Sequence, residues 1–391
     1  MATNTKDIEL VAQCLCKSNT FTTQVSQSSL PLEATFCHCD SCRHLTGAMQ
    51  SSSVPWPGPT EPIEGSNLAQ YEVSEKLTLF FCKTCSSPMF CRWHDMQDKT
   101  TTYHVPTGAL SNNNVPSMIR VQRHMFVSDA RDGGSAVWLQ KLDDSETQIP
   151  CWEGWPSRSE QVDPRNMDIA EKPSVDDVPV YCHCKGVNLV FRSGAAKAEF
   201  SNTAKDKLPW FVDPENYRLL ASFDACDSCR ISTGADVFNW CFTLLRHLDF
   251  PSSADQLSEQ GQFPNNTPAL KTAVIANNRD PRLGTLTYYS SSPNVQRYFC
   301  SKCSATVFYA VDSRPDMVDL AIGLLQANDG ARAEGALTWG LGMMVWDGDV
   351  KGGWRESFVD IIKNNAVDWR VTNGWPKAWA VIAREKREAA K

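Results

Sequence analysis

"FCHCDSCRHLTGA" spans residues 36–48, and residues 223–235 read "FDACDSCRISTGA". The two stretches share Cys-Asp-Ser-Cys-Arg and Thr-Gly-Ala in register, but Asp224 stands in the second where Cys37 stands in the first. A cysteine cluster that occurs twice indicates an internal duplication. The lost sulfur indicates that the two copies have diverged in what they do.

Further cysteines extend the duplication in both directions. They fall into two series of the same order: Cys14, Cys16, Cys37, Cys39, Cys42, Cys82 and Cys85, and then Cys182, Cys184, Cys226, Cys229, Cys300 and Cys303. Other text repeats as well: "LFFCKTC" with "QRYFCSKC", "EGWP" (153–156) with "NGWP" (373–376), and "HMFVSDARDGG" (124–134) with "GMMVWDGDVKGG" (342–353). The last pair places His124 opposite Gly342. Together these landmarks predict a tandem duplication with a period far longer than that of solenoid repeats.

The polar and acidic segment 157–177 separates the copies and is predicted to be a linker. Domain 1 is then expected over residues 8–156 and domain 2 over 178–380, followed by a helical tail at 381–391. Domain 2 carries two insertions, within 195–218 and 250–280, which we expect to be surface loops.

Short runs rich in β-branched and aromatic residues dominate the rest of the chain. The clearest are "LTLFFC", "TTYHV", "MIRVQRHMFV", "QRYFC", "ATVFYAV" and "MVDLAIGLL". They predict a mainly β fold of two tandem domains, with antiparallel sheets pinned by metal and a short C-terminal helix.

Composition excludes several classes of function. The formal net charge of −7 and the lack of a basic run argue against a nucleic-acid partner. We expect no signal peptide and no membrane span, and hence a cytoplasmic protein. The sixteen cysteines stand in Cys-x-Cys and Cys-x-x-Cys pairs, which suit metal in a reducing compartment better than disulfides.

Zinc binds thiolates in tetrahedral sets, and a closed set of four is structural. Two such sets are predicted: Cys14, Cys16, Cys82 and Cys85 in domain 1, and Cys182, Cys184, Cys300 and Cys303 in domain 2. The middle cluster supplies only Cys37, Cys39 and Cys42, which would leave one position open for water or substrate. In the alternative, a fourth protein ligand closes this site, with His38, His44, His94, His104 and His124 as candidates. Cys91 and Cys151 are expected to be small core residues.

This order of motifs resembles the glutathione-dependent formaldehyde-activating enzyme family, whose domain is shared with centromere protein V. The resemblance runs through both copies, over about residues 10–130 and 180–350. It implies a β-tent fold of the Mss4-like kind and a structural zinc on Cys14, Cys16, Cys82 and Cys85. It also implies a catalytic zinc on Cys37, Cys39 and Cys42, and carbon–sulfur lyase chemistry in which the glutathione thiol adds to formaldehyde and is released again.

Domain 1 is expected to be the active half and domain 2 a degenerate one. For Asp224 two alternatives stay open: it completes a weaker zinc site with Cys226 and Cys229, or the second reactive site has decayed, which the sequence favours.

Around the domain 1 cluster, Arg43, His44 and Thr46 are candidates for substrate contact, and His124 for acid–base catalysis. The plainer alternatives are that Arg43 bonds backbone carbonyls and that His124 is a half-exposed strand residue.

Three functions therefore compete. The first is a zinc-dependent carbon–sulfur lyase acting on a small-molecule thiol adduct of an aldehyde or another electrophile, with glutathione as co-substrate. The second is a non-catalytic zinc scaffold. The third is a zinc-dependent dehydratase or isomerase acting on a specialised metabolite.

Overall fold

The computed structural model describes residues 7–142, 147–167, 177–251 and 262–389. Its first half contains β1 (Asp7–Gln13), β2 (Thr20–Ser26), β3 (Leu32–Cys37), α1 (Asp40–Thr46), β4 (Ser51–Pro55), α2 (Glu61–Glu64), β5 (Ala69–Ser74), β6 (Leu77–Phe81), β7 (Pro88–His94), β8 (Thr101–Pro106) and β9 (Ile119–Met125).

The second half contains β10 (Val178–Tyr181), β11 (Asn188–Phe191), α3 (Ser193–Ser201), β12 (Leu219–Asp224), α4 (Asp227–Thr233), β13 (Phe238–Leu244), β14 (Leu248–Asp249), α5 (Thr267–Ile275), β15 (Leu286–Ser292), β16 (Val295–Cys300), β17 (Thr306–Val311), β18 (Met317–Ala321), β19 (Leu337–Val345), α6 (Arg355–Thr372) and α7 (Trp379–Ala389). The predicted mainly β fold is confirmed, and the quoted β-rich runs all form strands.

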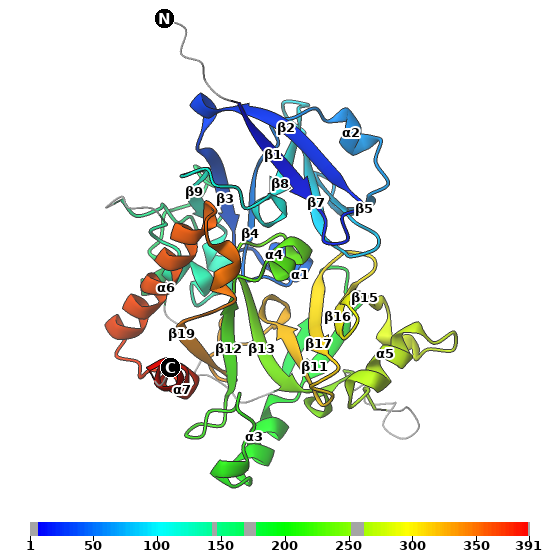
Figure 1. Cartoon of the computed structure of the whole chain (residues 1–391), viewed down its shortest axis with the longest axis vertical. Coiled ribbons are helices and arrows are strands. Elements are labelled where there is room, and N and C mark those ends of the chain that lie inside the picture. The colour runs from blue at the N-terminus through cyan, green and yellow to red at the C-terminus, as the bar shows by residue number, and fades with distance from the viewer. Residues whose placement is uncertain (1–6, 143–146, 168–176, 252–261, 390–391) are drawn as a thin grey trace, which may run out of the picture.

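Each half is built on a seven-stranded sheet, and the two sheets have the same strand order. The first runs β5-β6-β7-β8-β4-β3-β9 and the second β15-β16-β17-β18-β13-β12-β19. Figure 1 shows the first-half strands above the second-half strands, with α1 and α4 between them. The fold thus consists of two similar halves, as the repeated cysteine clusters predict.

The sheets are mixed rather than wholly antiparallel. The edge strand β9 runs parallel to β3, and β19 runs parallel to β12, each with a register shift partway along. A parallel neighbour needs a long connection. Here the chain returns to the sheet edge only after the late cysteine pair and two more strands.

Each half inserts a helix into the other. Helix α1 packs on the 3₁₀ turn η9 (Ile322–Leu324) of the second half, and α4 packs on η2 (Thr107–Ala109) of the first. The backbone N–H of Gly108 donates to Gly234 O at 3.0 Å, and that of Gly323 donates to Gly47 O at 3.0 Å. A Cβ at Gly108 or Gly323 would come within 2.6 Å of several backbone atoms, so only glycine permits this approach.

Helices α6 and α7 follow the second sheet and lie along one side of the molecule (Figure 1). Helix α6 packs on β19 and on η4 (Gly134–Trp138), so it contacts both halves. Arg355 at its start is fully buried, and its Nε lies 2.7 Å from Asp236 Oδ1. Within the described residues, no helix combines the length and apolar character that a membrane span requires.

Several boundaries differ from the sequence-based prediction. Residues 157–167 are not a free linker, because Val162 N–H donates to Cys151 O at 2.9 Å and Pro164 is buried; residues 168–176 lie outside the described part. The insertion within 195–218 includes most of α3, and the one within 250–280 includes α5, so they are not simple loops. Residues 252–261 lie outside the described part. The predicted C-terminal helix is confirmed and begins at Trp379.

Two of the repeated landmarks also need correction. Phe36 pairs with His124 whereas the equivalent Phe223 pairs with Met344, so His124 corresponds to Met344 and not to Gly342. The two Gly-Trp-Pro stretches lie in different local structures. Residues 153–156 run beside the segment that follows β9, whereas residues 373–376 end α6.

Candidate functional site

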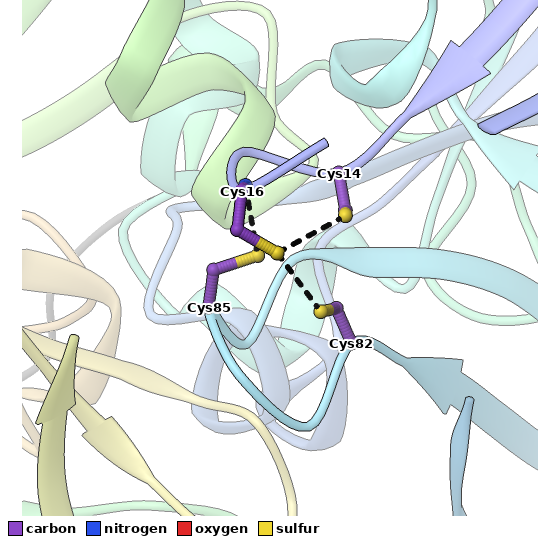
Figure 2. A group of neighbouring side chains, drawn as sticks. All are labelled: Cys14, Cys16, Cys82 and Cys85. Atoms are coloured by element: carbon purple, nitrogen blue, oxygen red, sulfur yellow. Dashed lines mark hydrogen bonds between the residues drawn. The ribbon is translucent and has the colours of Figure 1, made fainter. Parts of the chain in front are cut away.

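Four sulfurs converge between β1, its following turn and the loop between β6 and β7. Figure 2 shows Cys14, Cys16, Cys82 and Cys85 pointing at one another. The Sγ of Cys16 lies 3.6 Å from that of Cys14 and 3.5 Å from that of Cys82. All four ligand atoms lie within 4.8 Å of one another.

The second half repeats this set at the same place in its fold. The Sγ of Cys184 lies 3.6 Å from that of Cys182 and 3.5 Å from that of Cys300, and Cys303 completes the group. A tetrahedron of sulfurs at the usual zinc–sulfur length of about 2.3 Å has edges of about 3.8 Å. Both sets therefore fit a structural zinc ion, and each would tie an early strand to a late hairpin.

The middle cluster of the first half lies where β3 ends and α1 begins. Cys37 is the last residue of β3, and its Sγ lies 3.4 Å from that of Cys39. Cys39 is the N-cap of α1, and its Sγ accepts the backbone N–H of Cys42 at 3.3 Å. The helix start thus gathers three thiols within 4.8 Å of one another. They fit a metal with a coordination position left over.

His124 lies behind this cluster rather than in it. Its strand partner is Phe36, so it faces the side of the sheet opposite to Cys37. Its ring is fully buried, Nε2 donates to Leu139 O at 3.0 Å, and Nδ1 lies 2.9 Å from Nε2 of His38. Burial lowers the pKa of His124 to about 4. This position gives no support to the predicted acid–base role, nor to the idea of a half-exposed strand residue; instead, His124 braces the loop that holds the cysteines.

His44 and Thr46, two of the three residues expected to contact substrate, are bonded to protein, whereas Arg43 keeps Nε and Nη1 buried without a hydrogen-bond partner among the described residues. Arg43 is buried and its Nη2 lies 2.8 Å from Asp40 Oδ1. His44 stacks on Tyr181 of the second half, with Nδ1 2.6 Å from Tyr181 O. Thr46 Oγ1 donates to Cys42 O at 2.9 Å and accepts from Ala48 N.

The second half shows what the repeated arginine of the motif does there. Arg230, the equivalent of Arg43, donates from Nη1 to Gly108 O at 2.6 Å and to Leu110 O at 2.7 Å. It thereby ties α4 to the first half. Substrate contact by Arg43, His44 and Thr46 remains a prediction. The contacts of His44 point to packing between the halves, whereas those given above for Arg43 and Thr46 lie within the first half.

The face of the first sheet that carries Cys37 also carries four residues that the sequence did not single out as a group. Cys37 pairs with Ser51 on β4, and Ser53 follows on the same face. His104 on β8 pairs with Pro55 of β4 on one side and with Cys91 of β7 on the other. The four residues are Ser51, Ser53, Cys91 and His104. Their side chains are partly exposed, whereas Phe36 and Val54 on the other face are buried.

Cys91 belongs to this face and not simply to the core. The Cys91 thiol interacts electrostatically with Cys42. The part of the face that β7 forms therefore lies near the three-thiol cluster. Burial raises the pKa of the Cys91 thiol to about 12, which keeps it protonated and unreactive. The signal in the sequence was the period-2 alternation along the strands, which places residues 51, 53 and 55 on one face.

Aromatic side chains border the face. The ring of Trp155 lies 5.5 Å from that of Trp93, at the end of β7, and 5.3 Å from that of Phe126, just after β9. Trp155 therefore bridges the end of β7 and the residue just after β9, although the strand order places these two strands four positions apart.

The corresponding face of the second half is filled. Strands β12 and β13 are buried at every position, whereas β3 and β4 alternate. Register equates Ser51 with Phe238, Ser53 with Trp240 and Cys91 with Tyr309. The chain before β12 adds cover, since the Trp210 ring packs 4.7 Å from that of Phe242.

The cluster of the second half has a different chemical character. Asp224, Cys226 and Cys229 lie within 4.8 Å of one another, but protein donors already bond Asp224 and Cys229. Trp240 Nε1 donates to Asp224 Oδ2 at 3.1 Å, and Arg297 Nη1 lies 3.4 Å from Cys229 Sγ. The two clusters are therefore not interchangeable as metal sites.

Comparison with known proteins agrees with the geometry of the first half. Residues 9–129 match the model of a family described as glutathione-dependent formaldehyde-activating enzyme, and this range contains the first four-sulfur set and the three-thiol cluster. Searches of curated proteins and of solved structures found no match to the chain. Residues 9–129, from β1 to just beyond β9, are thus similar to the glutathione-dependent formaldehyde-activating enzyme family.

Proposed function

We propose that the first half is a zinc-dependent enzyme of the carbon–sulfur lyase type. It would add a small-molecule thiol such as glutathione to an aldehyde and catalyse the reverse cleavage. The observation that carries the proposal is that three thiols gather on a partly open sheet face in the first half, while the same face is filled in the second. We place the halves at residues 8–156 and 178–380, and we infer a cytoplasmic protein without a nucleic-acid partner from composition.

The reaction is a simple addition. The thiol sulfur forms a bond to the carbonyl carbon, the carbon–oxygen double bond becomes single, and the thiol proton ends on the oxygen. A zinc ion held by Cys37, Cys39 and Cys42 would supply Lewis acidity, which stabilises a thiolate or polarises a carbonyl.

His104 is the candidate on this face for moving the proton; it lies two strands from Cys37, level with Pro55. It stands on the same face as Cys37 and is partly exposed, and burial lowers its pKa, so it is neutral near pH 7. A neutral imidazole can accept the proton of an incoming thiol and return it to the new hydroxyl. The hydroxyls of Ser51 and Ser53 line the face between His104 and the cysteines, and either can donate a hydrogen bond to the carbonyl oxygen.

The second half would support the site without reacting. Its Tyr181 stacks on His44, and the backbone N–H of His183 donates to His44 O at 2.9 Å. The second half thus holds helix α1 in place. Because Cys39 and Cys42 lie at the start of α1, this contact positions two of the three thiols.

The test compares equivalent cysteines in the two halves. Cys39→Ser should abolish turnover of glutathione with formaldehyde, whereas Cys226→Ser, its structural counterpart, should leave turnover within about twofold of wild type. Other aldehydes should be assayed in the same way. Loss of turnover in Cys226→Ser with normal turnover in Cys39→Ser would overturn the proposal.

The alternatives predict other outcomes. A zinc scaffold would bind metal and fold, yet turn over no aldehyde with any thiol. A zinc-dependent dehydratase or isomerase would act on its substrate without a thiol, and its rate would not change when glutathione is left out.

A further inference from the structure

The cluster of the second half lies against a buried arginine. Arg297 on β16 is 7% exposed, and its Nη1 lies 3.4 Å from Cys229 Sγ. Its Nε donates to Ser291 Oγ at 3.2 Å, and its guanidinium lies 5.0 Å from the centre of the Tyr309 ring. These contacts fix the guanidinium from several sides.

Arg297 has no charged counterpart in the first half. It pairs with Tyr289 and Tyr309, just as Leu79 pairs with Tyr71 and Cys91 in the first half. A neutral leucine therefore stands at the position that the arginine takes beside the other cluster. The two changes, Cys37 to Asp224 and Leu79 to Arg297, both fall at the same cluster.

Both carboxylate oxygens of Asp224 in the second cluster also accept hydrogen bonds. Asp224 Oδ1 accepts the backbone N–H of Cys226 at 2.8 Å, and Oδ2 accepts Trp240 Nε1 at 3.1 Å. Asp224 itself is buried. A metal ion here would have to displace these bonds and share the site with a permanent positive charge.

We infer that Arg297 takes the place of a metal ion in the second half, so that Asp224, Cys226 and Cys229 form a metal-free cluster whose charge is balanced by the guanidinium. A guanidinium stays protonated under all ordinary conditions, and its repulsion of a divalent cation a few ångströms away is strong in a buried setting. The chain then binds three zinc ions: two in the four-sulfur sets and one at Cys37, Cys39 and Cys42.

The first experiment uses the wild-type chain loaded with zinc. Cys226 and Cys39 occupy equivalent positions and are both partly exposed. Iodoacetamide labelling followed by peptide mass spectrometry should modify Cys226 at least tenfold faster than Cys39. Partial removal of metal with a chelator, stopped when two zinc ions per chain remain, should accelerate Cys39 and leave Cys226 unchanged. Equal protection of the two thiols by zinc would overturn the inference, as would a zinc content of four per chain.

The second experiment restores the features of the first half. The double variant Arg297→Leu with Asp224→Cys should raise the zinc content from three to four per chain, and cobalt substitution should show one additional thiolate site. The control is the single variant Asp224→Cys, in which Arg297 keeps its contact with Cys229 Sγ, so the zinc content should stay at three per chain. A folded double variant that still binds three ions would count against the inference. Neither readout depends on turnover, so failure of the proposed function would leave both experiments decisive.

Discussion

Nε2 of His38 lies 2.9 Å from Nδ1 of His124, and both rings are fully buried behind the cysteine loop of the first half. Since His124 Nε2 donates to Leu139 O, its Nδ1 is unprotonated and accepts a hydrogen bond from the Nε2–H of His38. His38, the loop residue between Cys37 and Cys39, is therefore held in place by His124. The second half has Ala225 and Met344 at these places and no such pair.

A double-mutant cycle tests the pair. His124→Met leaves the His38 N–H buried without an acceptor, and we expect it to lower the free energy of unfolding by about 1–3 kcal/mol. His38→Ala with His124→Met reproduces the second half and should cost less than the sum of the single changes, by about 0.5–3 kcal/mol. Urea unfolding of the zinc-loaded protein measures all three variants. Strict additivity would show that the two rings do not depend on each other.

Structural and reactive cysteines should separate in their effect on stability. Cys14→Ser breaks a closed four-sulfur set, and metal binding to such a set is folding free energy, so the thermal midpoint should fall by about 10 °C or more. Cys39→Ser should shift the midpoint by no more than about 3 °C and remove one zinc ion per chain. Calorimetry and elemental analysis give both numbers. A similar fall in both variants would mean that the middle cluster is structural too.

A buried ion pair within the second half lies at the joint between the halves, where Arg355 Nη2 also donates to Leu110 O of the first half at 3.1 Å. Arg355 Nε lies 2.7 Å from Asp236 Oδ1, and both side chains are 5% exposed or less. Arg355→Met leaves the Asp236 charge buried without its partner, which should cost about 3–5 kcal/mol of stability.

Lys205→Ala is the matched control for the buried pair. Lys205 and Glu215 form an ion pair in which both side chains are well exposed, and its loss should change stability by no more than about 0.5 kcal/mol. Chemical denaturation compares the two variants. A loss below about 1 kcal/mol for Arg355→Met would show that this buried pair contributes little to the stability of the chain.

The cysteine spacing was enough to predict the duplication and the membership of both four-sulfur sets, because a metal site leaves its ligands paired in the sequence, and the runs of β-branched and aromatic residues predicted the β content. It did not reveal that α1 and α4 pack on the opposite halves. That contact depends on Gly108 and Gly323, where the absence of a side chain permits a close approach between distant segments. Two glycines among many give no sign of this in a single sequence.

Arg297 was missed for a related reason. It lies 68 residues from Cys229 and comes beside the cluster only through the pairing of β16 with its neighbours. His124 was misjudged because its correspondence was taken from similar letters, whereas a register shift in β9 and β19 decides which residue faces Phe36. Strand register depends on tertiary packing, which the local pattern does not contain.

The open face of the first half can be closed with the second half's own side chain. Trp240 corresponds to Ser53 and reaches the residue equivalent to Cys37, since its Nε1 donates to Asp224 Oδ2 at 3.1 Å. Ser53→Trp should therefore cover the thiol cluster, keep the zinc content at three per chain and lower kcat/KM for glutathione and aldehyde at least tenfold. The control is Gln24→Trp, an equally large change at an exposed position of β2, which should leave kcat/KM unchanged. Normal turnover in a folded, zinc-loaded Ser53→Trp variant would show that substrate does not reach the cluster across this face.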